Sequence, residues 1–136
     1  MFTKQISVFV ENRKGRLSEI MEVLSDGKVN LRALSMADTS DFGVLRFIAD
    51  DPETVERILK SHKMTVSLND VITVKLKDEA GSLAKVLCLL AASDIGVEYT
   101  YAFLARQSDS ACVVLRSSDD VKAAALLEEA GYVTGV

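Results

Sequence analysis

The chain has 136 residues, a net charge of −4 and 49% hydrophobic residues, a balance typical of a folded protein and not of a disordered one. No apolar run approaches the roughly 20 residues of a membrane-spanning helix. Residues 1–68 are neutral, so the whole excess of negative charge lies in residues 69–136. Without a basic stripe, the chain is a poor candidate for binding nucleic acid or an anionic membrane. Because the start leads directly into a strand pattern, we expect no signal peptide. The two cysteines, interpreted as reduced thiols, fit a cytoplasmic location.

An internal repeat sets the expected domain plan. The strand pattern Ile6–Val10 returns as Ile72–Leu76, and the residues after each strand follow the same order at an offset of 66 residues. Self-similarity of this length indicates two copies of one structural unit. We therefore predict two domains, residues 1–68 and residues 69–136, each near the lower size at which a domain folds alone.

Each copy opens with a strand, a loop and a helix. Apolar residues recur at i, i+3, i+4 and i+7 from Leu17 and again from Leu83, a spacing that predicts one amphipathic helix per copy. A loop that contains Gly15 or Gly81 precedes each helix. Gly27 suits the end of the first helix.

The remainder of each copy predicts a strand, a hairpin loop, a strand, a helix and a last strand. Asp51 and Asp119 stand where the second helices need an N-cap, and Pro52 suits the first helical position. The expected strands and hairpin loops of the two copies are Val29–Leu31, 38–41, Val44–Ile48 and Met64–Val66, then Ile95–Val97, 105–110, Cys112–Arg116 and Tyr132–Val133.

The order βαββαβ predicts an α+β fold, because two right-handed crossovers give a four-stranded antiparallel sheet with both helices on one face. We expect two such ferredoxin-like units, packed side by side into a continuous antiparallel sheet. The open face of the first unit carries Phe9, Val44 and Ile48. Exposed apolar surface of this kind suggests a partner, and a homodimer is expected. Cys88 and Leu89 broaden the apolar face of the first helix in the second copy.

The sequence contains no convincing catalytic constellation. The only histidine, His62, falls at the expected end of a helix, where a capping or surface role is favoured. Cys88 and Cys112 lie among apolar residues without a partner at metal-ligand spacing, which predicts buried reduced thiols. No phosphate-binding Gly-rich loop is present. Tyr99 and Tyr101 alternate along one expected strand and fit a core or interface stripe better than a platform for RNA bases. We expect a protein that is not an enzyme and that needs no cofactor or metal.

The loop Asn12–Leu17 is the most suggestive segment. It opens a helix, whose N-terminus presents backbone N–H groups and favours a carboxylate. Gly15 permits positive φ or the close approach of a ligand, and Asn12 carries both donors and acceptors. Two interpretations remain open from the residues alone. The loop binds a ligand, or Asn12 and its counterpart Asp78 only cap the helices while the glycine makes a turn.

The order of these motifs resembles the ACT domain. The pattern is a strand, Asn/Asp-x-x-Gly-x-Leu, an amphipathic helix, and then Val-Asn-Leu or Ile-Gly-Val opening the next strand, and it covers nearly the whole chain twice. The resemblance implies a non-catalytic sensor of a free amino acid, with the ligand held where two ACT domains meet. It implies one wall from the loop before the first helix and another from the start of the partner unit's second strand. Lys14 and Ala80 depart from the family, which often has Pro before the loop glycine.

The resemblance nominates two sites, each from the loop of one copy and the second-strand start of the other. The regulated partner is expected to be a separate enzyme or transporter. The competing prediction is a protein-interaction or oligomerisation module that binds no small ligand. The candidate ligand-binding residues are Asn12, Arg13, Lys14, Gly15, Arg16, Leu17, Asn30, Leu31, Asp78, Glu79, Ala80, Gly81, Ser82, Leu83, Gly96 and Val97.

The two nominated sites differ in charge. The first loop places three cations near Asn12, whereas the second loop has the carboxylates of Asp78 and Glu79. The strand starts differ as well, with Asn30 in the first copy and Gly96 in the second. We therefore predict that the two sites do not bind a ligand equally.

Overall fold

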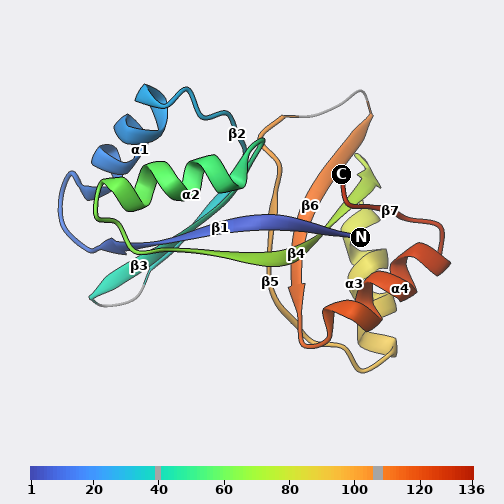
Figure 1. Ribbon diagram of the computed structural model, residues 1–136. Coiled ribbons are helices and arrows are strands. Elements are labelled where there is room, and N and C mark those ends of the chain that lie inside the picture. The colour runs from blue at the N-terminus through green and yellow to red at the C-terminus, as the bar shows by residue number, and fades with distance from the viewer. Residues whose placement is uncertain (39–40, 106–108) are drawn as a thin grey trace. The chain divides into compact units, whose positions relative to one another are not determined.

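The computed structural model describes residues 1–38, 41–105 and 109–136, so the expected hairpin loops lie partly outside the described residues. The chain is α+β (Figure 1). Its elements in order are β1 (Phe2–Glu11), α1 (Arg16–Asp26), β2 (Leu31–Asp38), β3 (Phe42–Ala49), α2 (Pro52–Ser61), β4 (Val66–Lys77), α3 (Ser82–Ala92), β5 (Val97–Ala102), β6 (Ser110–Ser117), α4 (Asp120–Glu129) and β7 (Val133–Thr134).

Two compact units make up the chain. The first unit is Lys4–Asn69, and the second unit is Asp70–Val136 together with Met1–Thr3. The division falls inside β4, which serves as the last strand of the first unit and the first strand of the second. The final strand expected near Met64 and the strand expected at Ile72 are therefore one uninterrupted element.

The first unit has the strand order β2-β3-β1-β4. β3 pairs antiparallel with both of its neighbours, so Phe47 lies opposite Ile6 on one side and Leu34 on the other. Both α1 and α2 cover one face of this sheet (Figure 1). Alternate strand residues point at the helices because side chains in a strand alternate between its two faces. The buried core of this unit comprises Ile6, Val8, Val10, Ile20, Leu24, Leu45, Phe47, Ala49, Val55, Leu59 and Met64.

The second unit repeats this plan with the order β5-β6-β4 and the short β7 beside β4. Met1–Thr3 belong to it through polar contacts. The Thr3 hydroxyl lies 2.9 Å from the Thr73 hydroxyl, and the Met1 ammonium lies 2.7 Å from the Glu128 carboxylate. Its core comprises Ile72, Val74, Leu76, Val86, Leu90, Ile95, Val113, Leu115, Ala123, Ala124 and Leu127. The predicted fold class, α+β with two ferredoxin-like units, is confirmed.

The helix ends follow their expected signals. The Asp51 side chain accepts a hydrogen bond from the Thr54 N–H, and Asp119 does the same for Lys122. These bonds satisfy N–H groups that have no partner inside the helix. Gly27 is the C-cap of α1. His62 is the C-cap of α2, with its Nδ1 lying 3.0 Å from the Ile58 carbonyl oxygen, as expected for a capping role.

Three predictions about burial are wrong or incomplete. Cys88 is exposed and Cys112 is only partly buried, so neither is a buried thiol. The buried residues that α3 contributes to the core are Val86 and Leu90, whereas Leu89 packs against the core but is only partly buried. On the face opposite the core of the first unit, Phe9 is 50% exposed but Ile48 is fully buried. The apolar open face is therefore smaller than expected.

Candidate functional site

The two loops adopt the same backbone conformation. Gly15 has φ 86° and ψ −9°, and Gly81 has φ 90° and ψ −9°. The N–H of the residue after each glycine donates to the carbonyl three residues earlier, at 3.2 Å in the first loop and 3.3 Å in the second. This bond and these angles define a type II turn, whose third position requires positive φ. Glycine is thus needed here for its conformation, since a Cβ atom at either position meets no atom within 4 Å.

The residue before each glycine sits at the turn position that proline favours. Ala80 has negative φ and is exposed. We expect Ala80→Pro to raise the free energy of unfolding by about 0.4–1 kcal/mol, because proline restricts the unfolded chain more than the folded turn. Urea denaturation of the two proteins measures this difference. A destabilised variant contradicts the type II geometry.

Gly15 and Gly81 are themselves the N-cap residues. Asn12 and Asp78 therefore stand three residues before the N-cap position. The expected turn at each glycine is confirmed. The backbone N–H of Asn12 donates to the Asp41 carbonyl at 3.2 Å, and that of Asp78 donates to the Asp109 carbonyl at 2.7 Å. These bonds tie each loop to the hairpin of its own unit.

The absence of a side-chain cap leaves a helix end suited to an anion. The first N–H groups of any helix have no intrahelical acceptor, and the macrodipole adds partial positive charge there. In the first unit the flanking side chain of Leu17 is 39% exposed, so this helix end is open to solvent. Leu83 occupies the same place on α3 and is partly buried.

Ion pairs offset most of the positive charge of the first loop. Arg16 Nη1 lies 2.8 Å from Glu19 Oε2, and this hydrogen bond holds the pKa of Glu19 below its usual range. Arg13 Nε lies 3.1 Å from Glu11 Oε2, which together with the charge of Glu19 raises the pKa of Arg13. Lys14 has no ion pair within the part of the chain that the structure describes. The cationic character predicted for this loop therefore rests mainly on Lys14.

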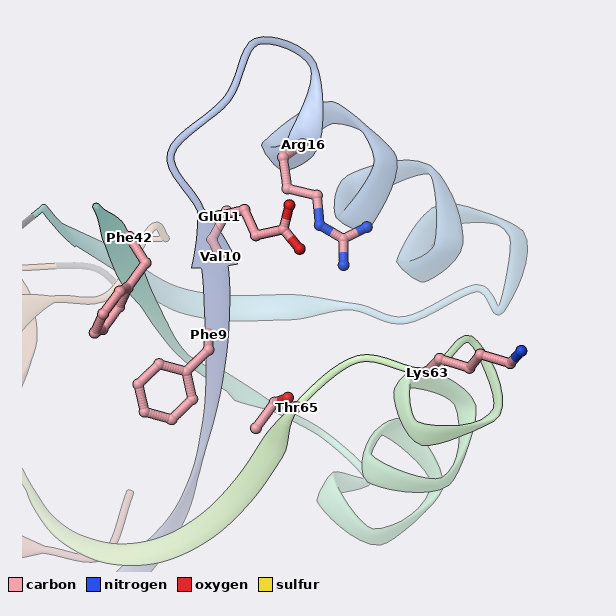
Figure 2. Close-up of a pocket in the computed structure, with 7 residues that line it drawn as sticks. All are labelled: Phe9, Val10, Glu11, Arg16, Phe42, Lys63 and Thr65. Atoms are coloured by element: carbon pink, nitrogen blue, oxygen red, sulfur yellow. The ribbon is translucent and has the colours of Figure 1, made fainter. Parts of the chain in front are cut away.

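A groove of about 280 Å³ adjoins the first loop (Figure 2). The groove lies beside the hydrogen bond that the Phe9 N–H of β1 donates to the carbonyl of Thr65, the residue before β4, at 3.1 Å. The rings of Phe9 and Phe42 meet edge to face at one side, with centroids 5.6 Å apart. Arg16 lines the groove from the start of α1, and its Nε is buried without a hydrogen-bond partner. The lining residues are Phe9, Val10, Glu11, Arg16, Phe42, Lys63 and Thr65.

The second unit has a groove of about 390 Å³ at the corresponding place. The repeat maps Phe9 onto Lys75 and Thr65 onto Val133, and both of these residues line the second groove. The fold thus produces the hollow in each unit, and the sequence decides its chemistry. Sequence reasoning missed the contribution of Phe42 and Lys63, because these residues are far from the loop in the chain.

The starts of β2 and β5 carry matching polar contacts. Asn30 Nδ2 donates to Asp50 Oδ2 at 3.2 Å, and Arg32 Nε lies 3.8 Å from Asp50 Oδ1. At the same place in the second unit the Gly96 N–H donates to Ser118 Oγ at 3.0 Å. Asp50 and Ser118 were not among the candidate residues. A signal was available, since both directly follow the third strand of their copy at the offset of 68 residues.

Within one unit the loop and the second-strand start lie at opposite ends of the sheet. In the first unit Glu11 pairs with Phe42 and Asp38 pairs with Gly43, so the loop lies near the end of β2. The start of β2 pairs at the other end of β3, where Leu31 lies opposite Ala49. The structure therefore does not bring these two groups of candidate residues together within a unit. A single unit cannot enclose a ligand between them.

The described residues offer no group of three metal-ligating side chains. No helix in residues 1–38, 41–105 and 109–136 has the length and apolar character needed to cross a membrane.

The chain thus consists of two ferredoxin-like units, each with a positive-φ glycine at the N-cap of its first helix. The family described as "ACT domain pair" matches residues 1–134. The chain belongs to this family. It is 38% identical to protein BT0572 from Bacteroides thetaiotaomicron, with a TM-score of 0.91 over 99% of this chain and 92% of that one.

More distant structures share the fold. The regulatory subunit of aspartate kinase from Thermus thermophilus has a TM-score of 0.66 at 13% identity, over 94% of this chain and 91% of that one. The corresponding subunit from Thermus flavus has a TM-score of 0.63 at 14% identity, over 93% and 91%. No curated protein matches the sequence.

Proposed function

We propose that this ACT domain pair is a cytoplasmic, non-catalytic regulatory protein that binds a free amino acid. The observation that carries the proposal is the duplicated loop. Two helices begin at a positive-φ glycine without a side-chain cap, and such ends favour a carboxylate. An amino acid supplies a carboxylate together with an ammonium group, and the polar strand starts at Asn30 and Gly96 offer acceptors for the latter.

The ligand is proposed to lie between the loop of one ACT unit and the second-strand start of another. The supporting argument is the separation of these two features within each unit. The second ACT unit is provided by the same chain or by a second copy, and we propose a homodimer. Binding that joins two units stabilises one arrangement over others, and this differential affinity is what allows a ligand to regulate.

The regulated partner is proposed to be a separate enzyme or transporter. Two structures that share this fold are regulatory subunits of aspartate kinase. For the present chain we infer a regulatory role of the same kind, exerted on a separate protein.

Titration calorimetry against the twenty common amino acids tests this proposal. We expect at least one to bind with a dissociation constant at or below the millimolar range, which at 100-fold ligand excess over that constant stabilises the fold by about 2.7 kcal/mol. A thermal unfolding scan checks the stabilisation independently. No binding to any amino acid at millimolar concentration contradicts the proposal.

The second candidate function is a protein-interaction or oligomerisation module without a small ligand. One specific observation favours it, the exposed apolar pair formed by Phe9 and Phe42 in the first unit, at 50% and 44% exposure, whose rings meet edge to face. Exposed apolar side chains gathered in this way often mark an interface. Assembly that persists in the absence of any amino-acid binding supports this alternative.

A further inference from the structure

Asp50 contacts two polar side chains at one end of the sheet in the first unit. It directly follows β3, one residue beyond the pair that Leu31 forms with Ala49. One carboxylate oxygen accepts a hydrogen bond from the Asn30 side-chain amide at 3.2 Å. The other lies 3.8 Å from the Arg32 guanidinium. A carboxylate has about four lone-pair sites, so these two contacts leave it with acceptor capacity.

In the second unit the position that corresponds to Asp50 carries no charge. Val97 pairs with Ser117 as Leu31 pairs with Ala49, so Ser118 is the counterpart of Asp50. Ser118 accepts a hydrogen bond from the Gly96 backbone. The two strand starts therefore differ at both contacting residues, Asn30 against Gly96 and Asp50 against Ser118. The first unit presents an amide and a carboxylate, and the second presents a bare backbone and a hydroxyl.

Asp50 contributes little to stability by its ion pair. Its side chain is 64% exposed and that of Arg32 is 37% exposed. Exposed ion pairs are screened by water and salt and give a median effect near zero. Neutralising Asp50 is thus expected to leave the fold intact, so its effect on a ligand is measurable separately.

We propose that Asp50 is the specificity-determining residue at this strand start and that it accepts the ammonium group of the bound amino acid. This inference rests on the proposed function and adds the recognition of the ammonium. The oxygen of the Asn30 side-chain amide is an acceptor as well, so the same strand start offers a second acceptor beside Asp50. Ser118 carries no charge and gives no such preference. A ligand with an ammonium group is therefore favoured over its deaminated analogue at the strand start of the first unit.

The experiment compares Asp50→Asn with the matched variant Ser118→Ala. The probes are the amino acid that binds most tightly among the twenty common ones and the 2-hydroxy acid with the same side chain. Removing the charge is expected to weaken amino-acid binding at least about tenfold, the size expected for one charge-assisted hydrogen bond. Binding of the hydroxy acid is expected to stay within about twofold of the wild type. Ser118→Ala is expected to change the amino-acid affinity less than Asp50→Asn does.

Three outcomes overturn the inference. Asp50→Asn binds the amino acid as the wild type does, or it weakens the amino acid and the hydroxy acid equally, which indicates a structural effect. The third outcome is a wild type that binds no amino acid, which contradicts the proposed function as well and is recognised before any variant is made. Urea denaturation of Asp50→Asn and of Asp50→Ser checks that each variant is folded, and either variant supplies the comparison.

Discussion

Phe47→Ala is expected to lower the free energy of unfolding by about 3–5 kcal/mol, the range for truncating a buried aromatic side chain. Phe47 is fully buried and lies on β3 between Ile6 of β1 and Leu34 of β2. The other members of this core belong to strands and helices, so they are expected to relax only partly into the cavity. A unit of this size has little stability to spare. The variant is therefore expected to lose much of the folded population of its unit.

Urea denaturation followed by circular dichroism measures this loss. Leu115→Ala is the matched variant, because the repeat places Leu115 at the position of Phe47 and it is also fully buried. It is expected to cost about 2–5 kcal/mol. Phe9→Ala is the control, since half of that side chain is exposed. A Phe47→Ala variant no less stable than Phe9→Ala contradicts the assignment of the core.

Gly15→Val and Gly81→Val, made together, are expected to abolish amino-acid binding while the protein stays folded. A β-branched residue is a genuine outlier at positive φ, and both glycines lie there, at φ 86° and 90°. The turn must therefore change and carry the helix N-terminus out of place. A Cβ atom added at either glycine meets no atom within 4 Å, so the effect comes from backbone strain and not from a steric clash. Calorimetry with the best-binding amino acid measures it.

Gly15→Asn with Gly81→Asn is the matched control, because asparagine tolerates the left-handed region. It is expected to retain most of the affinity. Sedimentation of all variants separates the two candidate functions. Loss of binding in the valine variant with unchanged assembly supports the ligand-binding protein. Full binding by the valine variant contradicts the role given to the loops.

Sequence patterns were sufficient where the cause of a structure is local. Asp51 caps α2 because its side chain reaches an N–H three residues away, and a cap of this kind is visible in the order of residues. The two helices after Gly15 and Gly81 were predictable from apolar spacing, and Gly27 ends the first of them. The repeat transferred each of these inferences from one copy to the other.

Predictions that depended on distant contacts were weaker. Cys88 is exposed although its neighbours are apolar, because the face of α3 that meets the core is set by the packing of the helix on the sheet. Asn12 was expected either to cap the helix or to bind a ligand, and the turn gives the N-cap position to Gly15. Asp50 was missed because its relation to Asn30 exists only once β2 and β3 pair.

The sequence by itself determined that this protein is a duplicated βαββαβ chain with a glycine loop before each first helix. Periodicity, turn residues and caps act over a few residues, and a repeat needs only comparison along the chain. Only the tertiary structure decided that each loop lies at the opposite end of its sheet from its own second-strand start. That property follows from strand pairing between segments far apart in sequence. It is also the property that makes a second unit necessary for the proposed site.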